Sequence, residues 1–177
     1  FATEENVSFT KQLLAPLNGK KKIFCIIGAS RPDKMWPTEH WIEFLKPLAE
    51  KALELGCKTV LIKCGTKGMY FHSGKVSDIG RRVELNASEW TDREVLQPCF
   101  KAETVLSATG TGDASIAAFL TAMLRGKTPE KCTVLAAAEG ACAVTAYDAL
   151  SGLKSIEELE EKIKSGWEQN LGERLCL

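Results

Sequence analysis

The chain has 177 residues, with 23 basic and 23 acidic side chains, so its formal net charge at pH 7 is zero. This balance gives no electrostatic basis for binding nucleic acid or an anionic membrane surface. Hydrophobic residues make up 45% of the chain, yet no apolar run approaches the ~20 residues of a transmembrane helix. The composition therefore favours one globular domain over residues 1–177, with neither nucleic acid nor a membrane as partner.

The first predicted elements are short apolar strands separated by a helix. Residues 23–27 form a continuous apolar run closed by a glycine, which is typical of a buried parallel strand. Thr38 can cap a helix that ends near the glycine at position 56, and Pro47 predicts either a kink or a junction of two helices there. Residues 58–63 predict a second buried strand, and residues 69–72 a third.

The second half of the chain is predicted to be mostly helical. Residues 75–107 are the least regular part, with strand-like pieces at 82–85 and 103–106. Helices are predicted over 113–124, after Thr128 with its following proline, and after the capping box that Ser155 begins. Strands that alternate with helices indicate an α/β fold with a mostly parallel sheet.

The cysteines indicate a reducing compartment. Their number is odd, their spacing is irregular, and no C-x-x-C occurs; they are Cys25, Cys57, Cys64, Cys99, Cys132, Cys142 and Cys176. Several lie inside apolar runs, so we interpret them as reduced core thiols of a cytoplasmic protein. A zinc site is disfavoured, because neither His40 nor His72 lies near a pair of cysteines.

The segment Thr109-Gly110-Thr111-Gly112-Asp113 carries the main chemical signal. It places a glycine turn and a carboxylate at the start of a helix, where unpaired N–H groups and the helix dipole favour an anion. One interpretation is phosphoryl transfer, with the amides of residues 110–113 as an anion hole and Asp113 as the general base. The alternative is an ordinary core helix that Asp113 merely caps. Two glycines around Thr111 favour the first, because glycine suits a sharp bend or a close approach to a ligand.

Three motifs resemble those of the ribokinase-like (PfkB) carbohydrate kinase family. Residues 107–113 are similar to its D-T-x-G-A-G-D signature, although Ser107 and Ala108 replace the usual Asp and Thr. Residues 58–70 resemble the family's apolar strand followed by L-G-x-x-G, and residues 135–144 resemble its alanine-rich helix over the nucleotide. The motifs occur in the family's order, and the likeness covers residues 57–165.

The resemblance implies a fold and a set of site residues. The fold would be a three-layer α/β arrangement around a mostly parallel central sheet, in a partial kinase domain without the N-terminal part and the lid. The implied catalytic residues are Gly110, Thr111, Gly112 and Asp113. The residues implied to approach ATP are Lys63, Gly65, Thr66, Gly68, Ala137 and Gly140. A monovalent cation such as K⁺ would be held, mostly through carbonyl groups, by Thr109, Ala143, Ala146, Asp148 and Gly152.

The implied activity is transfer of the γ-phosphoryl group of ATP to a sugar hydroxyl, with Mg²⁺ bridging the phosphates. One alternative is a nucleoside kinase of the same superfamily. Another is a catalytically inert, nucleotide-binding fragment, which is favoured by the absence of the family's N-x-x-E motif before the 58–63 strand. The small-molecule partner would be a sugar, and an open sheet edge would favour a homodimer.

Overall fold

The computed structural model describes residues 25–26, 38–76 and 85–170 of the chain. In chain order the elements are β1 (Cys25–Ile26), α2 (Thr38–Glu54), β2 (Thr59–Lys63), the 3-10 helix η3 (Gly65–Lys67), β3 (Met69–Ser73), α3 (Ala87–Trp90), β4 (Glu94–Gln97), α4 (Thr111–Leu124), α5 (Pro129–Ala143) and α6 (Ile156–Lys164). None of the helices in these ranges is long and apolar enough to cross a membrane.

The four described strands form one sheet in the order β1-β2-β3-β4. β1 pairs parallel with β2, placing Cys25 opposite Leu61. The pairs β2–β3 and β3–β4 are both antiparallel. The expectation of a mostly parallel sheet is therefore wrong for the described strands. The reason lies in the η3 turn, which joins β2 directly to β3 and is too short for the crossover that parallel neighbours require.

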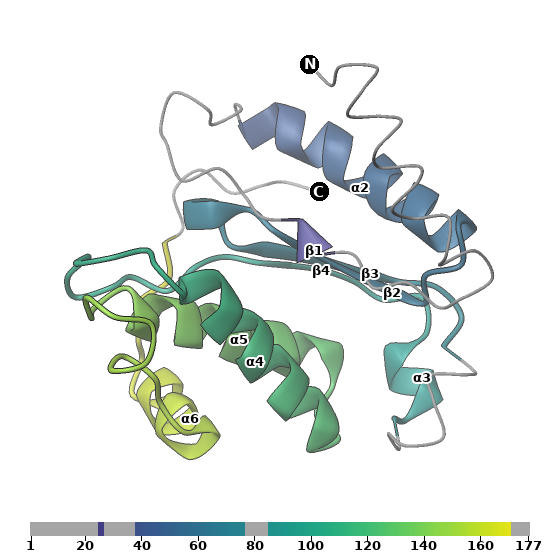
Figure 1. The fold of residues 1–177 in the computed structure, drawn as a ribbon. Coiled ribbons are helices and arrows are strands. Elements are labelled where there is room, and N and C mark those ends of the chain that lie inside the picture. Colours follow the sequence, from purple (N-terminus) through teal and green to yellow (C-terminus); the bar gives the residue numbers. More distant parts are fainter. Residues whose placement is uncertain (1–24, 27–37, 77–84, 171–177) are drawn as a thin grey trace, which may run out of the picture.

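The elements form three layers, which confirms the predicted three-layer α/β arrangement (Figure 1). α2 covers one face of the sheet, and α4, α5 and α6 lie on the other (Figure 1). Neighbouring β3 residues divide between the two cores, because successive side chains of a strand point to opposite faces. Tyr70 packs with Leu45 and Ile62 in the cluster beneath α2. Phe71 packs with Trp90 and Phe119 in the larger cluster beneath α4 and α5.

Helix ends follow the sequence signals closely. Thr128 Oγ1 accepts a hydrogen bond from Lys131 N at the start of α5. Ser155 and Glu158 form both bonds of the predicted capping box at the start of α6. Pro47 lies within the single helix α2, and α4 begins at residue 111, two residues earlier than expected.

The middle of the chain departs from the prediction. The strand-like piece at 103–106 adopts no regular structure, and β4 at 94–97 was not predicted. Of the other two expected strands, only Cys25–Ile26 of 23–27 and only Leu85 of 82–85 fall within the described residues. Leu85 precedes α3 without regular structure.

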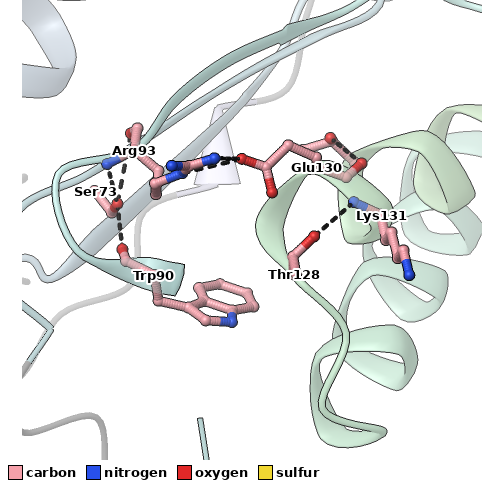
Figure 2. Close-up of polar contacts among 7 residues, drawn as sticks. Ser73, Trp90, Arg93, Thr128, Glu130 and Lys131 are labelled. Atoms are coloured by element: carbon pink, nitrogen blue, oxygen red, sulfur yellow. Dashed lines mark hydrogen bonds and ion pairs between the residues drawn. The ribbon is translucent and has the colours of Figure 1, made fainter. Parts of the chain in front are cut away.

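A polar contact joins the β3–β4 corner to α5 (Figure 2). Arg93 forms an ion pair with Glu130 in the first turn of α5. Behind it, Ser73 Oγ donates to Trp90 O (2.6 Å) and accepts from Arg93 N (3.0 Å). The corner that carries Trp90 into the core is thus attached to the helix that packs beside α4.

Candidate active site

The 109–113 segment forms a tight turn that leads directly into α4. Gly110 adopts the left-handed conformation, with φ of 75°, immediately before the first helical residue. The first α-helical hydrogen bond runs from Ala114 N to Gly110 O (2.9 Å). The backbone N–H groups of Gly112 and Asp113 precede this bond and so have no carbonyl partner within the helix. The structure thus has the predicted glycine turn at a helix N-terminus, an arrangement that attracts negative charge.

Lys63, the last residue of β2, brings a cation to the same helix end. A Cβ on Gly112 would overlap Lys63 Nζ and lie 3.4 Å from its Cε, so the ammonium group occupies the space beside this glycine. None of the ion pairs among the described residues involves Lys63 or Asp113. Asp113 is exposed in the first turn of α4. Over the described ranges, the site therefore combines N–H groups without a partner in the helix, a cation without an ion pair and an exposed carboxylate.

The side-chain hydroxyl of Thr111 is a further feature of the site, and the sequence analysis did not predict it. Its Oγ1 is buried and, among the described residues, lacks a hydrogen-bond partner. A buried hydroxyl without a partner is uncommon in native proteins and indicates that a water or ligand atom belongs there. Because Thr111 starts α4, this hydroxyl and the unpaired N–H groups belong to the same turn. The donor set fits a phosphate oxygen.

The two residues expected beside the adenine lie inside the helix pair. Ala137 is buried in the core cluster that contains Phe119. A Cβ on Gly140 would lie 2.6 Å from Ser115 Oγ and 3.7 Å from Thr111 Cγ2, so Gly140 permits the close approach of α5 to α4. The structure thus places Gly140 next to Thr111 of the 109–113 turn, whereas the side chain of Ala137 is buried in the core.

The η3 turn holds the remaining residues expected to approach ATP. Gly65 and Thr66 are exposed and lie just beyond Lys63. Gly68 has φ of 107°, and a Cβ there would overlap the Gln97 carbonyl. Gly68 therefore lets β2 and β3 turn tightly against the end of β4, which is sufficient reason for a glycine.

Two cysteines lie beside this turn. Cys99 Sγ donates to Gly65 O (3.3 Å). Burial raises the pKa of Cys64 to about 12 and that of Cys99 to about 11. Both thiols are therefore protonated at neutral pH and are poor nucleophiles.

Four of the residues expected at a monovalent cation lie at the end of α5 or in the 144–154 loop, which joins α5 to α6. The fifth, Thr109, lies before α4, where its N–H donates to Ser107 Oγ (3.1 Å). Val144 O accepts from Leu106 N (2.8 Å) and Ser107 N (3.3 Å), which lead into the turn. A Cβ on Gly152 would lie 2.8 Å from Cys142 O and 2.9 Å from Ala143 Cα. Ala143 and Gly152 are therefore neighbours.

The Asp148 carboxylate is held by three hydrogen bonds within its own loop. Its Oδ1 accepts from Leu150 N (2.8 Å) and Ser151 N (2.7 Å), and its Oδ2 accepts from Ser151 Oγ (2.6 Å). These hydrogen bonds lower its pKa to about 2. Ala146 donates its N–H to Ala143 O (3.3 Å) in the turn after α5. Over the described residues, no three His, Cys, Asp or Glu side chains gather to hold a metal ion.

Comparison with known proteins identifies the class. The pfkB family carbohydrate kinase model matches residues 33–156, which is more than half of the chain. The chain belongs to this family, as the motifs predicted. Ribokinase of Arabidopsis thaliana is 30% identical over 129 residues, which cover 72% of this chain and 29% of that protein. The nucleoside kinase of Methanocaldococcus jannaschii is 33% identical over 73 residues, which cover 41% of this chain and 24% of that protein.

Solved structures confirm the ribokinase-like fold. Arabidopsis thaliana ribokinase complexed with ribose and ATP superposes with a TM-score of 0.57 at 21% identity, covering 90% of this chain and 53% of that one. Thermotoga maritima ribokinase gives a TM-score of 0.52 at 28% identity, covering 72% and 39%. The chain spans less than a third of the length of the curated relatives that it matches.

Proposed function

We propose that the protein phosphorylates a sugar hydroxyl with ATP, using the 109–113 turn as its catalytic centre. The observation that carries this proposal is the meeting of Lys63 Nζ with the N-terminus of α4, beside the exposed carboxylate of Asp113. A cation and unpaired N–H groups suit the oxygens of a transferring phosphoryl group. The carboxylate beside them suits the proton that an attacking hydroxyl must lose.

In the proposed reaction, the acceptor hydroxyl oxygen forms a bond to the γ-phosphorus of ATP while the bond from that phosphorus to the bridging oxygen breaks. Asp113 takes the hydroxyl proton, and ADP leaves with the electron pair of the broken bond. The N–H groups of Gly112 and Asp113 and the Lys63 ammonium stabilise the charge on the phosphoryl oxygens.

Two ions belong to the same proposal. Mg²⁺ would be held by the phosphate oxygens of ATP and by water, since no carboxylate cluster among the described residues offers it a site. K⁺ would be held by the carbonyl oxygens of Thr109, Ala143, Ala146, Asp148 and Gly152 around the 144–154 loop. A cytoplasmic, reducing setting agrees with the described thiols of Cys64, Cys99, Cys132 and Cys142, which form no disulfide.

The test is Asp113→Asn in the full-length protein that carries these residues. We expect kcat to fall by ~10²-fold or more, because the general base is lost, while KM for ATP changes little. Steady-state assays that couple ADP release to a panel of sugars and nucleosides measure both constants. Glu157→Gln is the matched control, since it neutralises an exposed carboxylate in the first turn of α6 and should leave kcat unchanged.

Near-normal kcat in Asp113→Asn would overturn the assignment of the base. Turnover with nucleosides and none with sugars would instead identify a nucleoside kinase. Failure of the wild-type protein with every acceptor would favour the inert nucleotide-binding alternative.

A further inference from the structure

Glu139 is a buried carboxylate within the apolar second half of α5. Only 3% of the residue is exposed, and its neighbours along the helix are alanines, a glycine and a cysteine. Burial raises its pKa, while the backbone N–H of Lys154 favours the ionised form. Burying a charged group is costly unless it is well paired. This residue therefore calls for an explanation that helix packing does not supply.

Within the described part of the chain, the hydrogen-bond partner of Glu139 is a backbone group at the end of the 144–154 loop. Lys154 N donates to Oε1 (3.2 Å) and Oε2 (3.3 Å) of Glu139. Lys154 directly precedes Ser155, the residue that caps α6. The carboxylate thus fixes the point at which the loop enters the last helix.

The same loop packs against the proposed catalytic turn. Its first residue, Val144, accepts hydrogen bonds from Leu106 N and Ser107 N, just before the 109–113 segment. Its middle residue, Ala149, lies so close to Gly110 that a Cβ there would overlap the Ala149 Cβ and lie 2.9 Å from its Cα. Ala149 therefore packs directly against Gly110, the left-handed residue that precedes α4.

We propose that Glu139 is a positioning residue for phosphoryl transfer: by holding Lys154 N–H it fixes the 144–154 loop, and Ala149 of that loop supports the Gly110 turn. This inference rests on the proposed function in one respect, namely that the turn is the catalytic centre. The structural link from Glu139 to the Gly110 turn does not depend on that function and can be tested without measuring activity.

A residue that only stabilised the fold would behave differently. Removing Glu139 relieves the cost of a buried charge, and because Lys154 is exposed its N–H can bond water instead. Methionine is nearly as long as glutamate, favours helices and accepts hydrogen bonds only weakly. If Glu139 acts by positioning, its loss should leave the melting temperature unchanged or higher while the turn loosens and turnover slows.

The experiment compares Glu139→Met and Glu139→Gln with the wild-type full-length protein. For Glu139→Met we expect faster hydrogen exchange in residues 106–112 and 148–154, and a kcat lowered by ~10-fold or more with KM for ATP nearly unchanged. Glu139→Gln keeps one carbonyl acceptor for Lys154 N and should restore most of kcat. Glu161→Ala, which removes an exposed carboxylate from α6, is the control and should change neither measurement.

Unchanged exchange at 106–112 together with unchanged kcat in Glu139→Met would overturn the proposal, even where Asp113→Asn confirms the base. A wild-type protein without turnover would overturn the proposed function and the catalytic part of this inference, while exchange still decides the link to the turn. Should the methionine variant fail to fold, Glu139→Ala, which suits the small side chains of α5, is measured in the same way.

Discussion

Gly110 and Gly112 are two residues apart, but a side chain at each would meet a different obstacle. At Gly110 the left-handed φ of 75° strains any other residue, and a Cβ would press on the Ala149 backbone. At Gly112 the backbone is helical, and the atoms nearest to an added Cβ belong to the flexible end of Lys63. The first glycine is therefore required by the fold, whereas the second leaves room for the ammonium group.

This difference predicts opposite behaviour for two alanine variants. Gly112→Ala should change the free energy of unfolding by about 1 kcal/mol or less, because alanine suits a helix, yet it should lower kcat at least ~10-fold by displacing Lys63 Nζ. Gly110→Ala should destabilise the protein by ~1–3 kcal/mol through backbone strain. Urea denaturation and ADP-release assays measure the two effects. Full activity in Gly112→Ala would show that the place of the Lys63 ammonium group has no role in turnover.

Among the elements, α6 depends most clearly on local signals. Its capping box pairs Ser155 Oγ with Glu158 N (3.2 Å), and Glu158 Oε2 with Ser155 N (2.8 Å). Ser155→Ala should lower the free energy of unfolding by ~1 kcal/mol, because an N–H group of the first turn loses its acceptor. Urea denaturation provides the measurement. Thr104→Ala, at an exposed residue outside the helices and strands, should have no comparable effect, and an equal loss in both variants would contradict the capping argument.

Local signals explain which elements could be predicted. Thr128 and Ser155 cap their helices through bonds to residues three positions away, so the sequence itself holds the information. The strand at 94–97 is short and carries no alternating pattern that sets it apart, so only its pairing with β3 makes it a strand. Residues 103–106 show the converse, since their β-like composition finds no neighbouring strand within the described sheet.

In the candidate site, too, local features could be predicted from the sequence and contacts between distant residues could not. Its contiguous motif at 109–113 could be located from the sequence, because the turn and the helix start are local features. The approach of Lys63 to Gly112 and the bond from Glu139 to Lys154 could not, because each depends on how distant elements pack.

At the scale of the whole molecule, three aromatic rings join a strand and two helices. Phe71 of β3, Trp90 of α3 and Phe119 of α4 have ring centroids 5.7, 5.8 and 6.2 Å apart, and both pairs that include Trp90 meet edge to face. Edge-to-face pairs add to the stability gained from burial. The trio therefore joins the irregular middle of the chain to the layer that carries the 109–113 turn.

Trp90→Ala should lower the free energy of unfolding by ~3–5 kcal/mol, because it leaves a cavity that the Phe71 and Phe119 rings do not fill. Chemical denaturation followed by circular dichroism tests this. Leu124→Ala, at a position that is 64% exposed, is the control and should change the free energy of unfolding by ~0.5 kcal/mol or less. A small effect at Trp90 would mean that the middle of the chain is not anchored through this ring.

The antiparallel order β2-β3-β4 also has a consequence for the folding pathway. These three strands follow one another in the chain, as do α4 and α5, so most of their contacts close short loops. The parallel pairing of β1 with β2 closes a longer loop, because α2 lies between these strands in the chain. We therefore expect it to form more slowly than the β2–β3 hairpin. The β2–β3 hairpin and the α4–α5 pair can therefore form before β1 joins the sheet. The proposed chemical centre forms only when these two units meet, because Lys63 and Gly112 lie further apart in the chain than the paired residues of β1 and β2.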